Sequence, residues 1–113
     1  MACVQNQLSQ VSRASIPVLD ECQARGIAFV PFFPLGSGFI RPNPVLGNEY
    51  VVGNAKRLGI TPAQVALAWT LGLAPNILLI PGTSSRRHLE ENLAVADIQL
   101  DDQARQELTA AAA

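Results

Sequence analysis

The sequence predicts an α/β fold in which parallel strands alternate with helices. Two continuous apolar runs, 27–33 and 77–80, are typical of strands that are covered on both faces of a parallel sheet. The segments around them carry helix start and stop signals. The resulting order of strand, helix, strand, paired helices, strand, helix and helix indicates βαβ units with right-handed crossovers. Because 49% of its 113 residues are hydrophobic, the chain is expected to bury a core over residues 1–113.

The first part of the chain is expected to form a strand and a helix. Residues 2–7 are short and lean apolar, which favours a strand, and a polar loop follows them. Ser15 is placed to cap the helix, Pro17 fits its first turn and Gly26 ends it. Helical spacing brings three apolar side chains to one face of this helix, namely Val18, Leu19 and Cys22.

A proline interrupts the second strand. Because Pro31 has no N–H to donate to a sheet ladder, it is expected to mark the end of the strand or a bulge. Residues 32–38 are then placed in the loop beyond the strand. The stretch 36–48, with three glycines and two prolines, is expected to be the longest irregular region.

Two helices are expected in the middle of the chain. The first covers about 49–58 and is ended by Gly59. The second begins with a capping box, in which Thr61 is the N-cap and Gln64 reaches back to it. Its apolar residues surround most of the helix, so Trp69 is expected to lie in the core.

The chain is expected to end in a strand and two helices. The apolar run 77–80 favours the strand. The first helix contains Leu89 and Leu93, and the last begins after Asp101.

Composition excludes several classes of function. The formal net charge is −1 and both signs are mixed along the chain, so we expect no nucleic-acid partner and no membrane partner. The apolar runs fall short of the roughly 20 residues of a membrane helix, and the N-terminus lacks the pattern of a secretory signal, so the expected compartment is the cytoplasm. Cys3 and Cys22 lack the spacing of a zinc or redox site, so we expect buried free thiols and no metal.

Two loops that follow predicted strands carry features of anion-binding sites. Ligands of α/β folds bind beyond the carboxyl ends of the strands. One loop offers free N–H groups, a hydroxyl and glycines, in Leu35, Gly36, Ser37 and Gly38. The other combines a glycine, three hydroxyls, a helix N-terminus and two guanidinium groups, in Gly82, Thr83, Ser84, Ser85, Arg86 and Arg87.

At this point the sequence resembles a known family, the aldo-keto reductases, and most closely its bacterial members. The landmarks are Val4-Gln5-Asn6-Gln7, the stretches 26–36 and 60–69, and Ile80 to Ser85 together with His88 to Leu93. The resemblance covers nearly the whole chain. It implies the C-terminal portion of a (β/α)₈ TIM barrel, about strands six to eight with their helices.

The resemblance also implies a set of cofactor-binding residues. Gln5 resembles the glutamine that hydrogen-bonds the nicotinamide carboxamide, and Phe32 stands where the family places an aromatic on the nicotinamide ring. Leu35, Gly36 and Ser37 resemble the pyrophosphate loop. The loop around the adenosine 2′-phosphate is matched by Gly82, Thr83, Ser84 and Ser85, and the adenine contacts by Glu91 and Asn92. For Gln5 the alternative is a polar strand residue satisfied by its neighbours, and for Phe32 it is core packing.

The implied cofactor is NADP, with NAD as an alternative. Many members carry a lysine at the position of Gly82 and an arginine at that of His88, and both serve the 2′-phosphate. Arg86 or Arg87 is placed to supply the charge that is missing here. For His88 the alternative is a solvated helix residue.

The resemblance implies no catalytic residues in this chain. The family protonates the carbonyl with a tyrosine assisted by lysine, aspartate and histidine from earlier strands. This sequence has one tyrosine, one lysine and one histidine, namely Tyr50, Lys56 and His88. None of them is expected at a strand end. A full barrel takes roughly 250 residues, so about half is absent.

The expected function is therefore NAD(P)H-dependent reduction of aldehydes or ketones to alcohols, by a barrel of which this chain is an inactive C-terminal fragment. The expected partners are the nicotinamide cofactor and, if the barrel is completed, a small carbonyl substrate. Two alternatives stay open: a non-catalytic nucleotide-binding or half-barrel partner module, and a truncated gene product without activity of its own. Because a cut barrel exposes strand edges and apolar faces, the isolated chain is expected to be poorly soluble or oligomeric.

Overall fold

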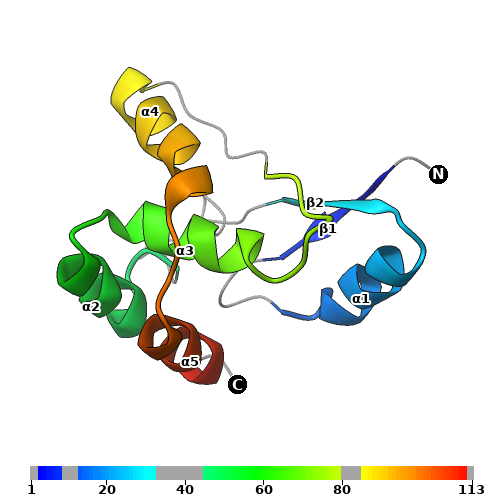
Figure 1. Cartoon of the computed structure of the whole chain (residues 1–113), viewed down its shortest axis with the longest axis horizontal. Coiled ribbons are helices and arrows are strands. Elements are labelled where there is room, and N and C mark those ends of the chain that lie inside the picture. The colour runs from blue at the N-terminus through cyan, green and yellow to red at the C-terminus, as the bar shows by residue number, and fades with distance from the viewer. Residues whose placement is uncertain (1–2, 9–12, 33–44, 80–84, 112–113) are drawn as a thin grey trace.

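The computed structural model describes residues 3–8, 13–32, 45–79 and 85–111. In chain order its elements are β1 (Cys3–Gln7), α1 (Ile16–Ala24), β2 (Ala28–Phe32), α2 (Glu49–Leu58), α3 (Pro62–Leu71), α4 (Arg86–Ala94), a 3-10 turn (Val95–Asp97) and α5 (Asp102–Ala111). Figure 1 shows α1 on one side of the strands and α3 in the middle of the molecule. Within these segments no helix has the length and apolar character needed to cross a membrane.

The two strands are parallel, as the alternation of strands and helices predicts. Their register runs from Cys3 paired with Ala28 to Gln7 paired with Phe32. Both strands therefore end at the same edge of the sheet. The βαβ unit formed by β1, α1 and β2 agrees with the predicted order of elements.

The helix α1 has the predicted position but not the predicted cap. Ser15 stands at the N-cap, yet its side chain makes no capping hydrogen bond, because its backbone is helical (φ −87°, ψ −1°) and not extended. Leu19 and Cys22 are buried as expected, whereas Val18 is 38% exposed and lies outside the buried face. Gly26 takes the left-handed conformation at φ 67°, which ends the helix and turns the chain into β2.

Pro31 lies inside β2, so the expectation that it ends the strand is wrong. Phe32 is correspondingly the last residue of the strand and not the first of the loop. The hydrogen bonds of Phe29 explain why β2 tolerates a proline. The N–H of Phe29 donates to Asn76 O at 2.9 Å, and its C=O accepts from Leu78 N at 3.0 Å. Two residues on, Pro31 faces that same side, away from β1. Its missing N–H therefore takes no bond from the ladder between β1 and β2.

The strand predicted over 77–80 is reduced to a single bridge. Ile77 forms an isolated parallel bridge with Phe29, and Ile77 is buried. Leu78 is 58% exposed, and Ile80 lies outside the described residues. In the described part of the chain, the segment 77–79 pairs only with β2. The next backbone donor on that side of β2 would come from residue 31, which is a proline and has no N–H. Burial on both faces, which the apolar run predicts, is therefore not reached.

Two clusters form the core and α3 belongs to both. One cluster joins α2, α3 and α5 around buried apolar residues such as Val51, Leu67 and Leu108. The other joins α1 to the sheet and includes Leu8, Leu19, Cys22, Phe29 and Ile77. Leu71 and Leu73, at the end of α3, pack against both clusters. The end of α3 is thus the place where the helical and the sheet parts of the core meet.

The predicted end of α2 at Gly59 and the predicted capping box of α3 are confirmed, and Asn48 provides a cap for α2 that the sequence analysis did not identify. Asn48 accepts hydrogen bonds from the first N–H groups of α2, and Gly59 ends that helix at φ 71°. In α3 the capping box is complete: Thr61 Oγ1 accepts from Gln64 N and Gln64 Oε1 accepts from Thr61 N, both at 3.1 Å. Every residue of α3 from Gln64 to Thr70 is buried, and Trp69 lies in the core as predicted.

Arg13 attaches the loop after β1 to the last helix. Its guanidinium donates to the carbonyl oxygens of Leu108 and Thr109 near the end of α5 and lies 4.6 Å from the centre of the Trp69 ring. Trp69 Nε1 in turn donates to Thr109 Oγ1 at 3.2 Å. A cation at the C-terminal end of a helix is stabilised by the helix dipole, and a guanidinium stacks favourably on an indole. Partial burial lowers the pKa of Arg13.

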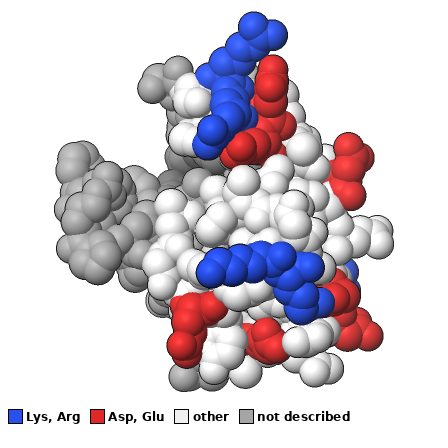
Figure 2. Space-filling model, turned by 90° about the vertical axis from the view of Figure 1, so that its left-hand side faces the viewer, with Lys and Arg blue, Asp and Glu red and all other residues white. Residues whose placement is uncertain are grey.

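Charged side chains of both signs are mixed on the surface. Figure 2 shows basic and acidic groups side by side over α4 at the top and over α2 and α5 below, with uncharged surface between them. On α4, Arg86 pairs with Glu90 at 3.3 Å and Arg87 pairs with Glu91 at 3.4 Å. On this face no region carries charge of one sign alone.

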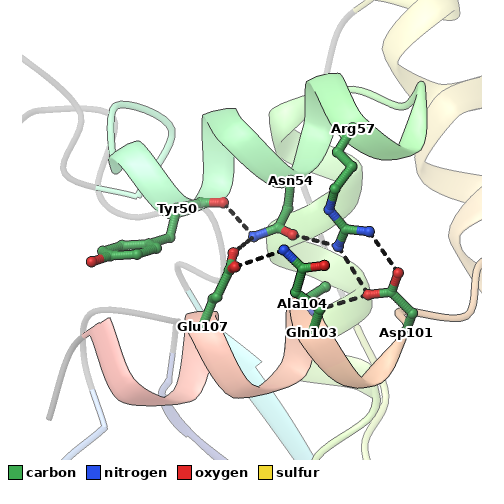
Figure 3. A network of polar contacts seen from close by, with 7 residues as sticks. All are labelled: Tyr50, Asn54, Arg57, Asp101, Gln103, Ala104 and Glu107. Atoms are coloured by element: carbon green, nitrogen blue, oxygen red, sulfur yellow. Dashed lines mark hydrogen bonds and ion pairs between the residues drawn. The ribbon is translucent and has the colours of Figure 1, made fainter.

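A polar network joins α5 to α2 (Figure 3). The Arg57 guanidinium donates to both carboxylate oxygens of Asp101, at 2.6 and 2.9 Å, and to Asn54 Oδ1 at 2.8 Å. Asn54 is buried, and its Nδ2 donates to Tyr50 O and to Glu107 Oε2. Asp101 Oδ1 also accepts from Ala104 N at 2.9 Å, so the same carboxylate caps α5.

The network lowers the pKa of both acids. The hydrogen bond from Arg57, and then that from Ala104 N, lower the pKa of Asp101 from 3.8 to about 2. The pKa of Glu107 is lowered chiefly by hydrogen bonds from Gln103 and Asn54. A carboxyl whose pKa is depressed in the folded state stabilises that state above its unfolded pKa, and this stabilisation is lost as the pH falls through the folded value.

We therefore predict that Asp101→Asn lowers the melting temperature near neutral pH and that the difference from the unchanged chain shrinks between pH 3.8 and about pH 2. The asparagine keeps a cap for α5 but loses the charge opposite Arg57. Melting followed by circular dichroism across this range measures the effect. Asp102→Asn, at the next position, is the control, and a difference between Asp101→Asn and the unchanged chain that stays constant with pH would contradict the assignment.

Candidate functional site

One face of the two-stranded sheet is open. Val4 and Phe29 are paired in register and pack with α1 in the core. Because side chains alternate along a strand, Gln5 and its partner Val30 point to the opposite face. Gln5 is exposed there. Its amide, with two donors and an acceptor, is thus available to a ligand on the open face.

Cys3 lies on this open face too, so the expectation that both thiols are buried is wrong for it. Cys3 is exposed and Cys22 is buried, and both are free. Cys3 stands two residues before Gln5 on the same side of β1, and both side chains are exposed there.

One predicted site residue, Phe32, lies at the carboxyl edge of the sheet. Phe32 pairs with Gln7 at the carboxyl end of both strands, the edge at which α/β folds bind ligands. In the sequence, one predicted loop follows β2 and the other follows the segment 77–79. Their residues Leu35, Gly36, Ser37, Gly82, Thr83 and Ser84 lie outside the described residues.

Ser85 begins α4 as the capping hydroxyl. Its Oγ accepts from His88 N at 3.3 Å. Arg86 and Arg87 follow in the first turn, with side chains 91% and 80% exposed. Each is paired with a glutamate one turn later, but exposed pairs of this kind contribute little to stability. Either guanidinium can therefore turn from its glutamate to an anionic ligand at small cost.

A contact that the sequence did not reveal holds α4 against α3. Gln64 Nε2 donates to Glu91 O at 3.0 Å, while Gln64 Oε1 completes the capping box with Thr61. One buried amide therefore caps α3 and fixes α4, which carries Glu91 and Asn92. The capping box pattern identifies Gln64, but its second partner lies 27 residues away and is not encoded locally.

The titratable residues that resemble catalytic types lie on helices. Tyr50 and Lys56 belong to α2 and His88 to α4, and all three are exposed. None of the three lies at an end of β1 or β2. Among residues 3–8, 13–32, 45–79 and 85–111, no group of three or more His, Cys, Asp or Glu side chains is arranged to hold a metal ion.

The fold and the strand-end residues define a parallel α/β protein whose candidate ligand site lies at the carboxyl ends of its strands. Residues 1–113 match the model of the aldo/keto reductase family, so this chain belongs to that family.

Individual proteins of known sequence or structure are similar to this chain as well. Pyridoxine 4-dehydrogenase of Escherichia coli strain K12 is 48% identical over 103 residues, which are 91% of this chain and 34% of the relative. An uncharacterized oxidoreductase of Schizosaccharomyces pombe is 42% identical over 101 residues, 88% of this chain and 31% of the relative. The structure of an aldo/keto reductase from Klebsiella pneumoniae in complex with NADP and acetate is similar with a TM-score of 0.86 and 27% identity, over 95% of this chain and 38% of that one.

The chain thus spans about a third of the length of these relatives. Its fold is that of a partial barrel, which confirms the predicted fold class. The bridge at Ile77 and the exposed face of β1 and β2 belong to a sheet that is larger in the whole proteins.

We predict that Gln64→Ala releases α4 from α3. The variant loses the bond to Glu91 O as well as half of the capping box, so amide hydrogen exchange over 86–94 should accelerate. Exchange measured by mass spectrometry reports this segment directly. Thr61→Ala is the matched control: it costs about 1 kcal/mol of cap stability but keeps the bond from Gln64 to α4. Equal acceleration in both variants would show that the link does not hold α4.

Proposed function

We propose that this chain is the cofactor-binding part of an NAD(P)H-dependent oxidoreductase that reduces aldehydes or ketones to alcohols. The observation that carries the proposal is the exposure of Gln5 on the open face of the sheet, at the position that resembles the nicotinamide-binding glutamine of the family. The Klebsiella pneumoniae relative was solved with NADP, which favours NADP over NAD as the cofactor.

At the nicotinamide end, the proposed roles are binding and orientation. The bound nicotinamide supplies the hydride. Gln5 donates to and accepts from its carboxamide, which fixes the face of the ring that meets the substrate. Phe32 offers an aromatic surface to the ring from the end of β2. Leu35, Gly36 and Ser37 form the pyrophosphate loop.

At the adenosine end, the proposed contacts come from the start of α4. Gly82, Thr83, Ser84 and Ser85 surround the 2′-phosphate, where the helix N-terminus and the exposed guanidinium groups of Arg86 and Arg87 favour an anion. His88, one turn into the helix, is proposed to lie at the same phosphate. Glu91 and Asn92 are proposed to contact adenine.

The chain is proposed to be inactive by itself. Reduction needs an acid that protonates the carbonyl oxygen, and Tyr50, Lys56 and His88 are on helices, away from the strand ends. The catalytic tetrad and the small carbonyl substrate would then belong to the completed barrel.

We expect NADPH to raise the melting temperature of this chain without any turnover of an added aldehyde. Binding to the folded state stabilises it by RT ln(1 + [L]/Kd), about 2.7 kcal/mol at a hundredfold excess over Kd. The double variant Arg86→Gln, Arg87→Gln should reduce the shift with NADPH more than that with NADH, because only NADPH carries the 2′-phosphate.

Arg25→Gln is the matched control, since Arg25 forms the same type of exposed pair with Glu21 on α1, at 2.6 Å. It should leave both shifts unchanged. The absence of any shift at millimolar NADPH, with the circular dichroism spectrum of a folded chain, would refute cofactor binding.

A second candidate function is that of a half-barrel partner module, and exposed apolar residues favour it. Leu78, Leu89 and Leu93 are 58%, 49% and 70% exposed. In the described part of the chain β1 pairs with β2 alone, so its other edge has free donors and acceptors. Exposed leucines and an open strand edge are typical of surfaces that another chain covers.

This candidate predicts that the isolated chain associates. Sizing chromatography with light scattering should give a mass above 12.0 kDa, and Leu89→Glu with Leu93→Glu should shift the chain toward the monomer. Val18→Glu is the control, because Val18 is also an exposed apolar residue, 38% exposed on α1. This variant should not dissociate the assembly. A monomer of the unchanged sequence that melts cooperatively would count against association.

A further inference from the structure

A pocket of about 340 Å³ lies between the end of α3, the segment after α4 and one face of α5. Its volume is at the lower end of the range of small-molecule sites. Apolar side chains line much of it, among them Leu71, Leu73 and Ile98, and Trp69 contributes as well. No acidic side chain is among the residues that line it, all of which are described.

Two hydrogen-bond donors stand side by side at this pocket. Arg105 and Thr109 both line it and are one turn apart on α5, so they share a face of that helix. In contrast to Arg57 or Arg87, Arg105 makes no side-chain hydrogen bond or ion pair with any described residue. Its guanidinium therefore has its full donor capacity available.

The hydroxyl of Thr109 is oriented by its neighbour. Thr109 Oγ1 accepts from Trp69 Nε1 at 3.2 Å, so one lone pair is occupied while the hydroxyl proton remains to be donated. A guanidinium and a hydroxyl next to each other match the two oxygens of a carboxylate. A phosphate dianion would call for a second cation, and none lines the pocket besides Arg105.

We propose that this pocket binds a small monocarboxylate with an apolar chain. The carboxylate accepts from Arg105 and Thr109, and the chain lies against Leu71, Leu73 and Ile98. This site goes beyond the proposed function. Asn76, which follows this end of α3, donates from Nδ2 to Ile27 O at 2.8 Å, next to the start of β2. The segment that follows the end of α3 thus reaches the edge where the strands begin, whereas Phe32 lies at the edge where they end.

Trp69 lines the pocket and is the only tryptophan in the sequence, so its fluorescence reports on binding. The probe is octanoate, below its micelle-forming concentration and without nicotinamide cofactor. We expect a saturable change in emission. Arg105→Gln should weaken octanoate binding at least about tenfold, the effect of losing a charge-assisted bond to a carboxylate. Arg25→Gln, which removes an exposed guanidinium from α1, should leave it unchanged.

Octanamide, with the same chain length but no charge, should bind at least several-fold more weakly than octanoate. Isothermal titration calorimetry covers the case in which binding leaves the emission unaltered. Equal affinities of the unchanged chain and Arg105→Gln, equal affinities for octanoate and octanamide, or no heat and no emission change from the folded chain would each overturn the proposal. These outcomes do not depend on whether NADPH binds, so failure here is distinct from failure of the proposed function.

Discussion

The burial of α3 from Gln64 to Thr70 is the constraint on which the rest of the structure depends. Its residues from Gln64 to Thr70 contact protein on all sides, and Leu71 and Leu73 connect the helical core to the core beneath the sheet. Each fully buried valine or leucine, such as Val65 and Leu67, contributes about 1.5–3 kcal/mol relative to an exposed one. Every other helix has an exposed face, so α3 determines where the others can lie.

The helix boundaries follow from local chemistry and were therefore predictable. Asn48, Gly59 and the capping box at Thr61 act within one turn of themselves, so the sequence contains the whole interaction. Burial is different, because it depends on what covers a residue. Leu78 and Cys3 carry the sequence signal of buried strands but lie on a sheet that is only partly covered in this chain. The register between β1 and β2 likewise decides that the backbone nitrogen of Pro31 faces away from β1. The sequence does not reveal this register.

The same distinction separates the predicted and unpredicted parts of the candidate site. The parallel pairing of β1 with β2 follows from the alternation of strands and helices along the sequence, whereas Phe32 at the strand end and the cap at Ser85 were not predicted. The bond from Gln64 to Glu91 and the bonds from Arg13 to the end of α5 join residues 27 and 95 or 96 positions apart. Such contacts need the tertiary arrangement, and no spacing rule finds them. The aldo/keto reductase family model spans the loops that local chemistry suggested, and their roles in binding stay a proposal.

The two ends of α3 separate the proposed functions physically. At the start of the helix, Gln64 holds α4, which carries the proposed adenosine contacts, and near its end Trp69 and Leu71 line the carboxylate pocket. Coupling between two ligands requires an element with two arrangements that both ligands bias. A helix that is buried from Gln64 to Thr70, capped at its start and packed against both core clusters at its end has little room for a second arrangement. We therefore infer that α3 acts as a fixed spacer, so that occupation of one site leaves the affinity of the other unchanged.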